Sequence, residues 1–151
     1  YPNLSDEQLS RVIEGLREYF LILREGGFIS MPSQVVDVAW HEFILFTKLY
    51  EEFCKRGMGK FIHHTPAEGM STPDLVKEGI KRAWYLSCLR EKIDPKNPAR
   101  LPLLFSLDAE LEIPDGFRYS LDCTGRDNEH CAGRIGCGGG GCGGCGGCGG
   151  G

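Results

Sequence analysis

Hydrophobic residues recur every three or four positions in the first part of the chain, which is the spacing of an amphipathic helix. Ser5 precedes this run, and Gln8 follows three positions later, as in a capping box. The glycine pair Gly26-Gly27 ends the run. The pattern predicts a helix over about residues 6–25, and its apolar positions are Leu9, Val12, Ile13, Leu16 and Phe20.

A second periodic run begins after Ser33, a candidate N-cap, and predicts one helix that continues to Gly57. Its apolar residues cover more than half of the circumference, which is typical of a central helix with neighbours on two sides. The apolar arc contains Val35, Val38, Ala39, Phe43, Leu45, Phe46, Leu49, Tyr50 and Phe53. The opposite, polar side contains Asp37, His41, Lys48 and Glu52, with Trp40 nearby. Glu42 falls within the apolar arc, so it needs a partner or access to solvent.

A third helix is predicted to begin at Thr72-Pro73-Asp74 and to reach about Lys92. This tripeptide supplies an N-cap, a proline at the first helical position and an acid near the positive end of the helix. Three prolines then predict a loop up to Pro102. Residues 103–112 are ambiguous, with Ser106 as the candidate cap of a short helix. Together the three runs predict a mainly α-helical, three-helix domain.

Composition separates this helical body from a tail. The chain has 151 residues, enough for one domain, and contains 22 glycines and 8 cysteines. Residues 136–151 are all glycine or cysteine, so most of the excess lies at one end. We therefore predict a helical domain over residues 1–122, with an irregular C-terminal part that includes a short extended segment at 117–121. A disordered, low-complexity tail over residues 123–151, without a fixed core, is expected to follow.

Net charge and apolar content restrict the expected partners. The formal net charge of -4 gives no basic excess, so no nucleic-acid partner is expected. No apolar run reaches the roughly 18–20 residues of a membrane-spanning helix, so no membrane partner is expected either. Cys54 and Cys88 are the cysteines of the body, which favours a reducing compartment and a cytoplasmic location. We expect both to be small core residues, and Trp40 and Trp84 to be packing anchors.

One motif runs through the second helix and the connection after it: Asp37-x-x-Trp40-His41, then Tyr50, Cys54, Gly59 and His63-His64. In this series, over about residues 33–66, the chain resembles the glycine-rich domain-containing protein-like family of plants and bacteria. The resemblance implies a helical domain, and the glycine-rich tail agrees with it. The family's domain has no settled catalytic activity, so the resemblance informs the fold rather than the function.

Polar residues of this motif suggest a site on the body. Asp37 and His41 are one helical turn apart, and a carboxylate beside an imidazole serves a general base or a metal centre. His63 and His64 lie in an extended segment and point to opposite sides, so at most one of them joins His41. With Asp37 or Glu42 they would form a three-ligand centre for zinc or another divalent ion. The alternative is a structural pair that joins two helices.

The tail contains a second candidate site. Cys142, Cys145 and Cys148 have the C-x-x-C spacing with which two thiolates bind one ion, and Cys137 can supply a fourth sulfur. Zinc, Cu(I) or an iron–sulfur cluster would suit these thiolates. The predicted ligands are Cys137, Cys142, Cys145 and Cys148, with Cys123, His130 and Cys131 as further candidates. No apolar residue shields such a site. The tail is alternatively a disordered extension, or a substrate whose cysteines are modified after translation.

Three function classes follow from these features. The first is a non-enzymatic intracellular module whose tail binds a soft metal ion, zinc or Cu(I). The second is an enzyme whose catalytic candidates are Asp37, His41 and His64. The third is a helical interaction module with the tail as a flexible tether. The expected partner is a protein or a metal ion, and the sequence itself favours the non-enzymatic class.

Overall fold

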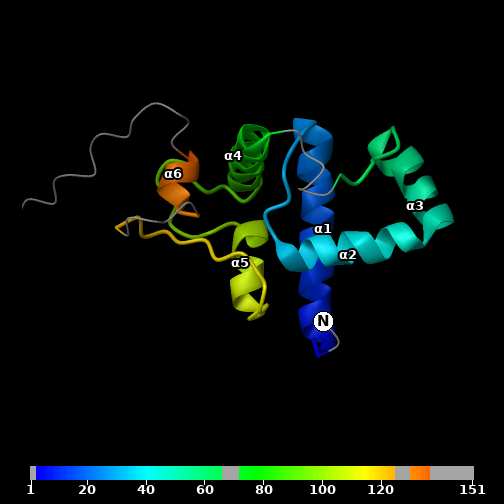
Figure 1. The fold of residues 1–151 in the computed structure, drawn as a ribbon, viewed down its shortest axis with the longest axis horizontal. Helices are drawn as coiled ribbons and strands as arrows, with labels where there is room; N and C mark the ends of the chain where they lie inside the picture. Colours follow the sequence, from blue (N-terminus) through cyan, green and yellow to red (C-terminus); the bar gives the residue numbers. More distant parts are fainter. Residues whose placement is uncertain (1–2, 66–71, 125–129, 137–151) are drawn as a thin grey trace, which may run out of the picture.

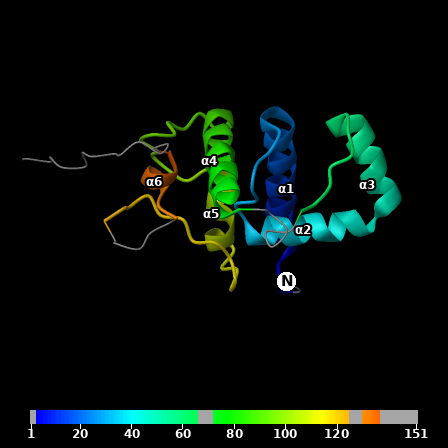
Figure 2. The same ribbon diagram turned by 45° about the horizontal axis from the view of Figure 1, so that its top comes forward.

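The computed structural model describes residues 3–65, 72–124 and 130–136, and within these ranges the chain is mainly helical, as predicted. The helices are α1 (Asp6–Gly26), α2 (Gln34–Leu45), α3 (Thr47–Phe53), α4 (Pro73–Arg90), α5 (Leu103–Glu110) and α6 (Ala132–Gly136), with a π-helical turn, η1 (Cys54–Met58), after α3. Helix α1 is central (Figure 1). Figures 1 and 2 both show α2 crossing it, with α4, α5 and α6 on one side and α3 on the other.

Helix α1 begins as its sequence predicts. The Ser5 side chain accepts a hydrogen bond from the Gln8 backbone, and the Gln8 side chain accepts one from the Ser5 backbone, so the capping box is complete. Two positions of its apolar series, Leu9 and Ile13, face solvent. The buried face that contacts α2, α4 and α5 consists of Val12, Gly15, Tyr19, Phe20 and Ile22.

The second predicted helix is broken, so the prediction of one central helix up to Gly57 is wrong. Phe46 leaves the helical conformation between α2 and α3, with φ -82° and ψ 61°. In a continuous helix, the ten residues from Trp40 to Tyr50 would span about 15 Å, so their side chains could not meet. The bend instead lets the Trp40 indole Nε1 donate a hydrogen bond to the Tyr50 hydroxyl at 3.1 Å. It also turns α3 away from α1, which leaves Leu45, Phe46 and Leu49 mostly exposed.

The burial of individual side chains also differs from the pattern predicted for the second helix. Trp40, placed near the polar side of the predicted helix, is buried and packs against Tyr19 and Phe20 of α1. Glu42, which was predicted to fall within the apolar arc, is exposed to solvent and therefore needs no buried partner. Trp40 and Trp84 are therefore packing anchors, as expected. The two body cysteines are confirmed as core residues, because both are free and fully buried.

A buried carboxylate fixes the start of α2. Asp108 of α5 has 2% of its surface exposed. It accepts hydrogen bonds from the Ser33 hydroxyl at 2.7 Å, the Gln34 backbone at 2.7 Å and the Val35 backbone at 3.1 Å. The Phe117 backbone donates a fourth, at 2.9 Å. Asp108 thus supplies acceptors for amide groups of the first turn, which have no partner inside the helix.

The C-terminal part is packed more fully than its sequence predicts. Helix α5 begins after Pro102, so Ser106 lies inside the helix and does not cap it. Ser120 and Cys131 form an isolated β-bridge in the region predicted to be extended. Helix α6 contacts α4, and its Ala132 and Ile135 belong to the hydrophobic core. The core therefore includes residues beyond 122, where none was expected. Among the described residues, no helix has the length and apolar character needed to cross a membrane.

Candidate metal centre

Helix α2 presents two polar side chains on its face toward a cavity. Asp37 and His41 are one turn apart, and His41 Nδ1 lies 3.5 Å from Asp37 Oδ2. The Ser33 cap and the Asp108 carboxylate fix the start of this helix, and buried Trp40 fixes its rotation against α1. The two side chains are therefore positioned by packing and capping on neighbouring parts of the helix rather than by their own contact.

The third polar side chain comes from the segment after η1. The Tyr50 hydroxyl accepts the Trp40 hydrogen bond and donates one to the Ile62 carbonyl at 2.6 Å. Tyr50 and Ile62 are both buried, so this relay ties the segment to α2 from the inside. His64 follows two residues later, and its ring packs edge-on against Trp40 with ring centroids 4.4 Å apart. The relay therefore places the His64 imidazole beside the polar face of α2.

Asp37, His41 and His64 converge. His64 Nε2 lies 2.9 Å from Asp37 Oδ1, and the two imidazole centroids are 4.3 Å apart. One potential ligand atom from each residue lies within 4.8 Å of the others. The His41 side chain is 50% exposed, whereas those of Asp37 and His64 are 24% and 11% exposed. The cluster is thus held on its inner side and open on its outer side.

The geometry of this cluster fits a metal ion. Tetrahedral zinc, with bonds of about 2.0–2.1 Å, places its ligand atoms about 3.3 Å apart. The separations of 2.9 Å and 3.5 Å involve different oxygens of Asp37, and a set with one ligand atom from each residue lies within 4.8 Å. Two imidazoles and one carboxylate suit zinc or iron(II) and leave coordination positions open for another molecule.

A large cavity lies directly beside the cluster. Its volume is about 1280 Å³, and Asp37, His41 and His64 are part of its wall. Tyr19 also lines it, and burial, with a smaller contribution from the charge of Asp37, raises the pKa of Tyr19 well above its ordinary value. This phenol stays neutral and able to donate a hydrogen bond. Open coordination positions of a bound ion would therefore face a cavity large enough for a small molecule.

Comparison with known proteins places the chain in a family. A family model described as UCP032817-like matches residues 1–140. The chain belongs to the UCP032817-like family. This description specifies no reaction, and it does not confirm the glycine-rich domain-containing label that the D-x-x-W-H motif suggested. No curated protein and no solved structure matches the chain.

The remaining ligand candidates of this UCP032817-like chain lie elsewhere. His63 is exposed and packs its ring against Phe61, with centroids 4.9 Å apart, outside the cluster. Glu42 also lies outside it. Cys123 and Cys131 are joined to each other in a disulfide bond, so their thiols do not act as additional ligands in this state. The predicted tail ligands, Cys137, Cys142, Cys145 and Cys148, lie outside the described residues.

Sequence reasoning missed the residues that position the cluster. Asp108 is the one carboxylate between the apolar residues Leu103 and Ala109, and an isolated acid in an apolar run indicates a buried partner. The relay from Trp40 through Tyr50 to Ile62 has a weaker signal, because only the need of a buried indole N–H for an acceptor points to it. The relay could not be assigned without the bend at Phe46.

Proposed function

We propose that the helical body binds a divalent transition-metal ion through Asp37, His41 and His64, with zinc as the ion that best fits these donors. The observation that carries this proposal is the convergence of three ligand atoms within 4.8 Å from two separate segments of the chain. A site with three protein ligands and a position open to a cavity is typical of catalytic rather than structural zinc. The proposal therefore favours the enzyme class over a purely structural ion.

The residues of the site would have distinct roles. Asp37 bridges the two imidazoles, and His64, packed on Trp40, provides the least mobile ligand. Exposed His41 completes the set. A bound ion supplies Lewis-acid chemistry, polarising an oxygen of a bound molecule or activating a water. Tyr19, kept neutral by burial, would be a hydrogen-bond donor in the same cavity.

Zinc titration of the full-length chain tests this proposal. Cys137, Cys142, Cys145 and Cys148 are first replaced by serine, so that their thiolates do not contribute to binding. In this background we expect one zinc per chain, and His64→Ala to weaken binding at least about tenfold. His63→Ala is the matched control and should bind zinc as tightly as the background. Equal affinity in the two alanine variants would exclude the body site.

The same titration separates the tail from the body. The prediction that the tail binds a soft metal ion concerns Cys137, Cys142, Cys145 and Cys148. If it is correct, the chain with its cysteines binds more zinc than the serine background does. Identical stoichiometry in the two chains would reject tail binding. A metal-binding tail belongs to the first function class, the non-enzymatic module. The non-enzymatic role and the cytoplasmic location of that class stay predictions.

A helical interaction module is the second candidate function, and a separate surface supports it. At the corner between α2 and α3, Leu45, Phe46 and Leu49 are 71%, 64% and 57% exposed. A contiguous exposed apolar patch is typical of a contact site. If the patch contacts a second copy of the chain, sedimentation velocity shows concentration-dependent association that Leu49→Glu abolishes. A chain that stays monomeric at all concentrations would reject this homotypic role.

A further inference from the structure

We propose that the cavity beside Asp37, His41 and His64 binds a small organic anion. Its phosphate or carboxylate group would lie among cationic side chains, and its apolar body would lie along exposed phenylalanines. This inference rests on the proposed function for the identity of the site, because the ion and the anion would share one cavity. Its own support comes from other residues, which are described next.

Positive charge gathers around this cavity. Among the described residues that line it, the cations come from α1, the segment after η1, α4 and α6, and the single carboxylate is Asp37. The cations are Arg24, Lys60, Lys77, Lys81 and Arg134. The whole chain has a net charge of -4, so this region opposes the overall charge. Charges of one sign around a concave surface focus the potential and concentrate ligands of opposite charge.

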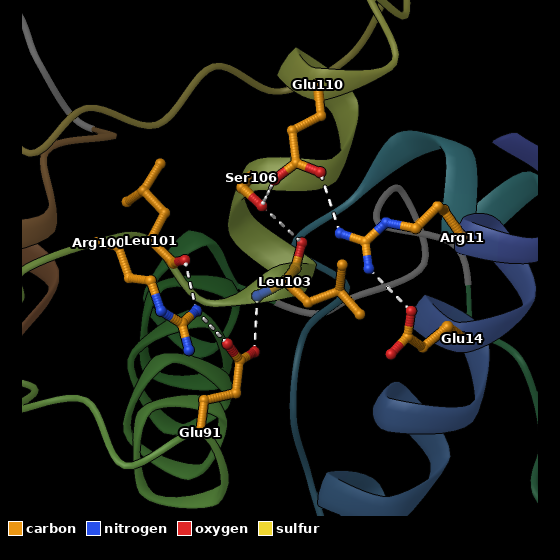
Figure 3. Close-up of polar contacts among 8 residues, drawn as sticks. All are labelled: Arg11, Glu14, Glu91, Arg100, Leu101, Leu103, Ser106 and Glu110. Atoms are coloured by element: carbon orange, nitrogen blue, oxygen red, sulfur yellow. Dashed lines mark hydrogen bonds and ion pairs between the residues drawn. The ribbon is translucent and has the colours of Figure 1, made fainter.

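A second cavity is also lined by charged side chains, but these pair with one another and are not available to a ligand. It has a volume of about 640 Å³ and is lined by both arginines and glutamates. Figure 3 shows these groups engaged with one another: Arg11 with Glu14 and Glu110, and Arg100 with Glu91. The carboxylates there neutralise the guanidinium groups, which leaves little attraction for an added anion.

Three cations of the first cavity are not neutralised in this way. Lys81 is paired with Glu78, but the side chains of Arg24, Lys60 and Arg134 form no ion pair or hydrogen bond with any described residue. Guanidinium and ammonium groups without a protein partner can donate directly to phosphate or carboxylate oxygens. These three side chains therefore carry the inference.

Aromatic side chains indicate the rest of the ligand. Phe28, Phe61 and Phe117 all line this cavity and are 42%, 48% and 36% exposed. A pocket that combines apolar walls with a few convergent polar groups is typical of small-molecule sites, and about 1280 Å³ is ample for a metabolite-sized ligand. The combination favours an anion with an aromatic or apolar body over a bare inorganic ion.

Binding of three related probes tests the ligand class. Calorimetry uses the full chain with its tail cysteines replaced by serine, with and without zinc, and the probes phenyl phosphate, benzoate and benzyl alcohol. We expect at least one of the two anions to bind at least about tenfold more tightly than neutral benzyl alcohol. The tighter anion identifies phosphate or carboxylate as the recognised group. Equal binding of all three, or binding of none, would overturn the inference.

Matched variants test the residues. Replacing Arg24, Lys60 and Arg134 by glutamine should weaken binding of the tighter anion at least about tenfold. The control replaces Arg17, Lys48 and Lys96 by glutamine, which removes the same charge from exposed positions outside both cavities. It should change the affinity less than about twofold. Equal losses in the two variants would mean that net charge, not this cavity, attracts the anion. Lys60→Gln alone provides the test if the triple variant fails to fold.

The outcomes for metal and anion are separable. A chain that binds zinc at the body site but does not discriminate anions from benzyl alcohol overturns this inference and leaves the proposed function standing. A chain that binds no zinc but loses anion affinity with Arg24, Lys60 and Arg134 supports the anion site and overturns the metal proposal. The zinc titration thus decides the metal proposal, and the anion titration decides the anion proposal.

Discussion

Two aspartates serve the same helix in different ways. Asp108 contacts the first turn of α2 from α5, is almost fully buried, and accepts four hydrogen bonds. Asp37 lies within α2, has 24% of its side chain exposed, and meets two imidazoles at the edge of a cavity. The residue type is the same, but its partners and its access to solvent differ.

The difference lies in what each carboxylate can still bind. The oxygens of Asp108 are occupied by hydroxyl and backbone donors that cannot leave without unfolding the start of the helix. The neighbours of Asp37 are imidazoles, which can turn from mutual contact to an ion that all three groups share. Saturation by hydroxyl and backbone donors indicates an anchor, whereas imidazole partners beside a cavity are the surroundings that the proposed metal site requires.

Removing the anchor should have the largest effect. Asp108→Ala leaves the Ser33 hydroxyl and three backbone amides without their acceptor, so we expect the free energy of unfolding to fall by about 3–5 kcal/mol. Chemical denaturation followed by circular dichroism measures this loss. Asp108→Asn, which keeps one carbonyl oxygen, should lose less. If Asp108→Ala costs less than about 1 kcal/mol, the four hydrogen bonds do not anchor α2.

Removing the binding carboxylate should matter chiefly when zinc is present. At free zinc about 100 times the dissociation constant, the tail-serine chain should gain about 2.7 kcal/mol of stability. Asp37→Ala should lose this gain, but without zinc it should be within about 1 kcal/mol of the parent because its contacts with the two imidazoles are partly exposed. Thermal unfolding with and without zinc measures both. A large loss without zinc would make Asp37 a second anchor.

The relay residue Tyr50 joins α2 to the segment that contains His64, and its effect on stability should depend on pH. Burial is the main cause that raises the pKa of Tyr50 to about 12, from an ordinary value of 10. The folded state therefore keeps the proton more tightly, so the resulting stability is complete below pH 10 and is lost as the pH rises to about 12.

Tyr50→Phe removes this titrating group and leaves the Trp40 N–H without its acceptor. At pH 8 we expect a loss of about 1–2 kcal/mol, with weaker zinc binding because His64 is less well placed. Between pH 10 and 12 its stability should fall less steeply than that of the parent chain. Urea denaturation across this range provides the comparison. Parallel curves would show that other groups, such as buried Cys88, account for the alkaline loss.

The smallest effect on stability is expected at His41. Half of this side chain is exposed, and its contact with Asp37 is a surface pair within one helix. His41→Ala should therefore change the free energy of unfolding by less than about 0.5 kcal/mol in the absence of zinc. It should nevertheless remove most of the stabilisation by zinc. Full zinc stabilisation in His41→Ala would reduce the site to Asp37 and His64.

The sequence was sufficient wherever a local rule decides the structure. The capping box of Ser5 and Gln8 and the Thr72-Pro73 start of the third helix both appear in the structure. The one-turn spacing of Asp37 and His41 likewise predicts their contact. Each depends only on neighbours three or four positions apart. The extended segment also implies that only one of two adjacent histidines can face Asp37.

Long-range contacts account for what the sequence did not predict. The bend at Phe46 interrupts an apolar pattern that locally favours a continuous helix, and the contacts of Tyr50 with Trp40 and Ile62 depend on that bend. The cations of the cavity come from four parts of the chain and share no spacing. No periodic pattern identifies such residues, because only the fold brings them together.

The fixed position of Ile62 determines which of the two following histidines faces Asp37. In the extended segment that follows, neighbouring side chains alternate in direction. Because the Tyr50 hydroxyl fixes Ile62, this alternation brings His64 beside Asp37 and turns His63 away from it.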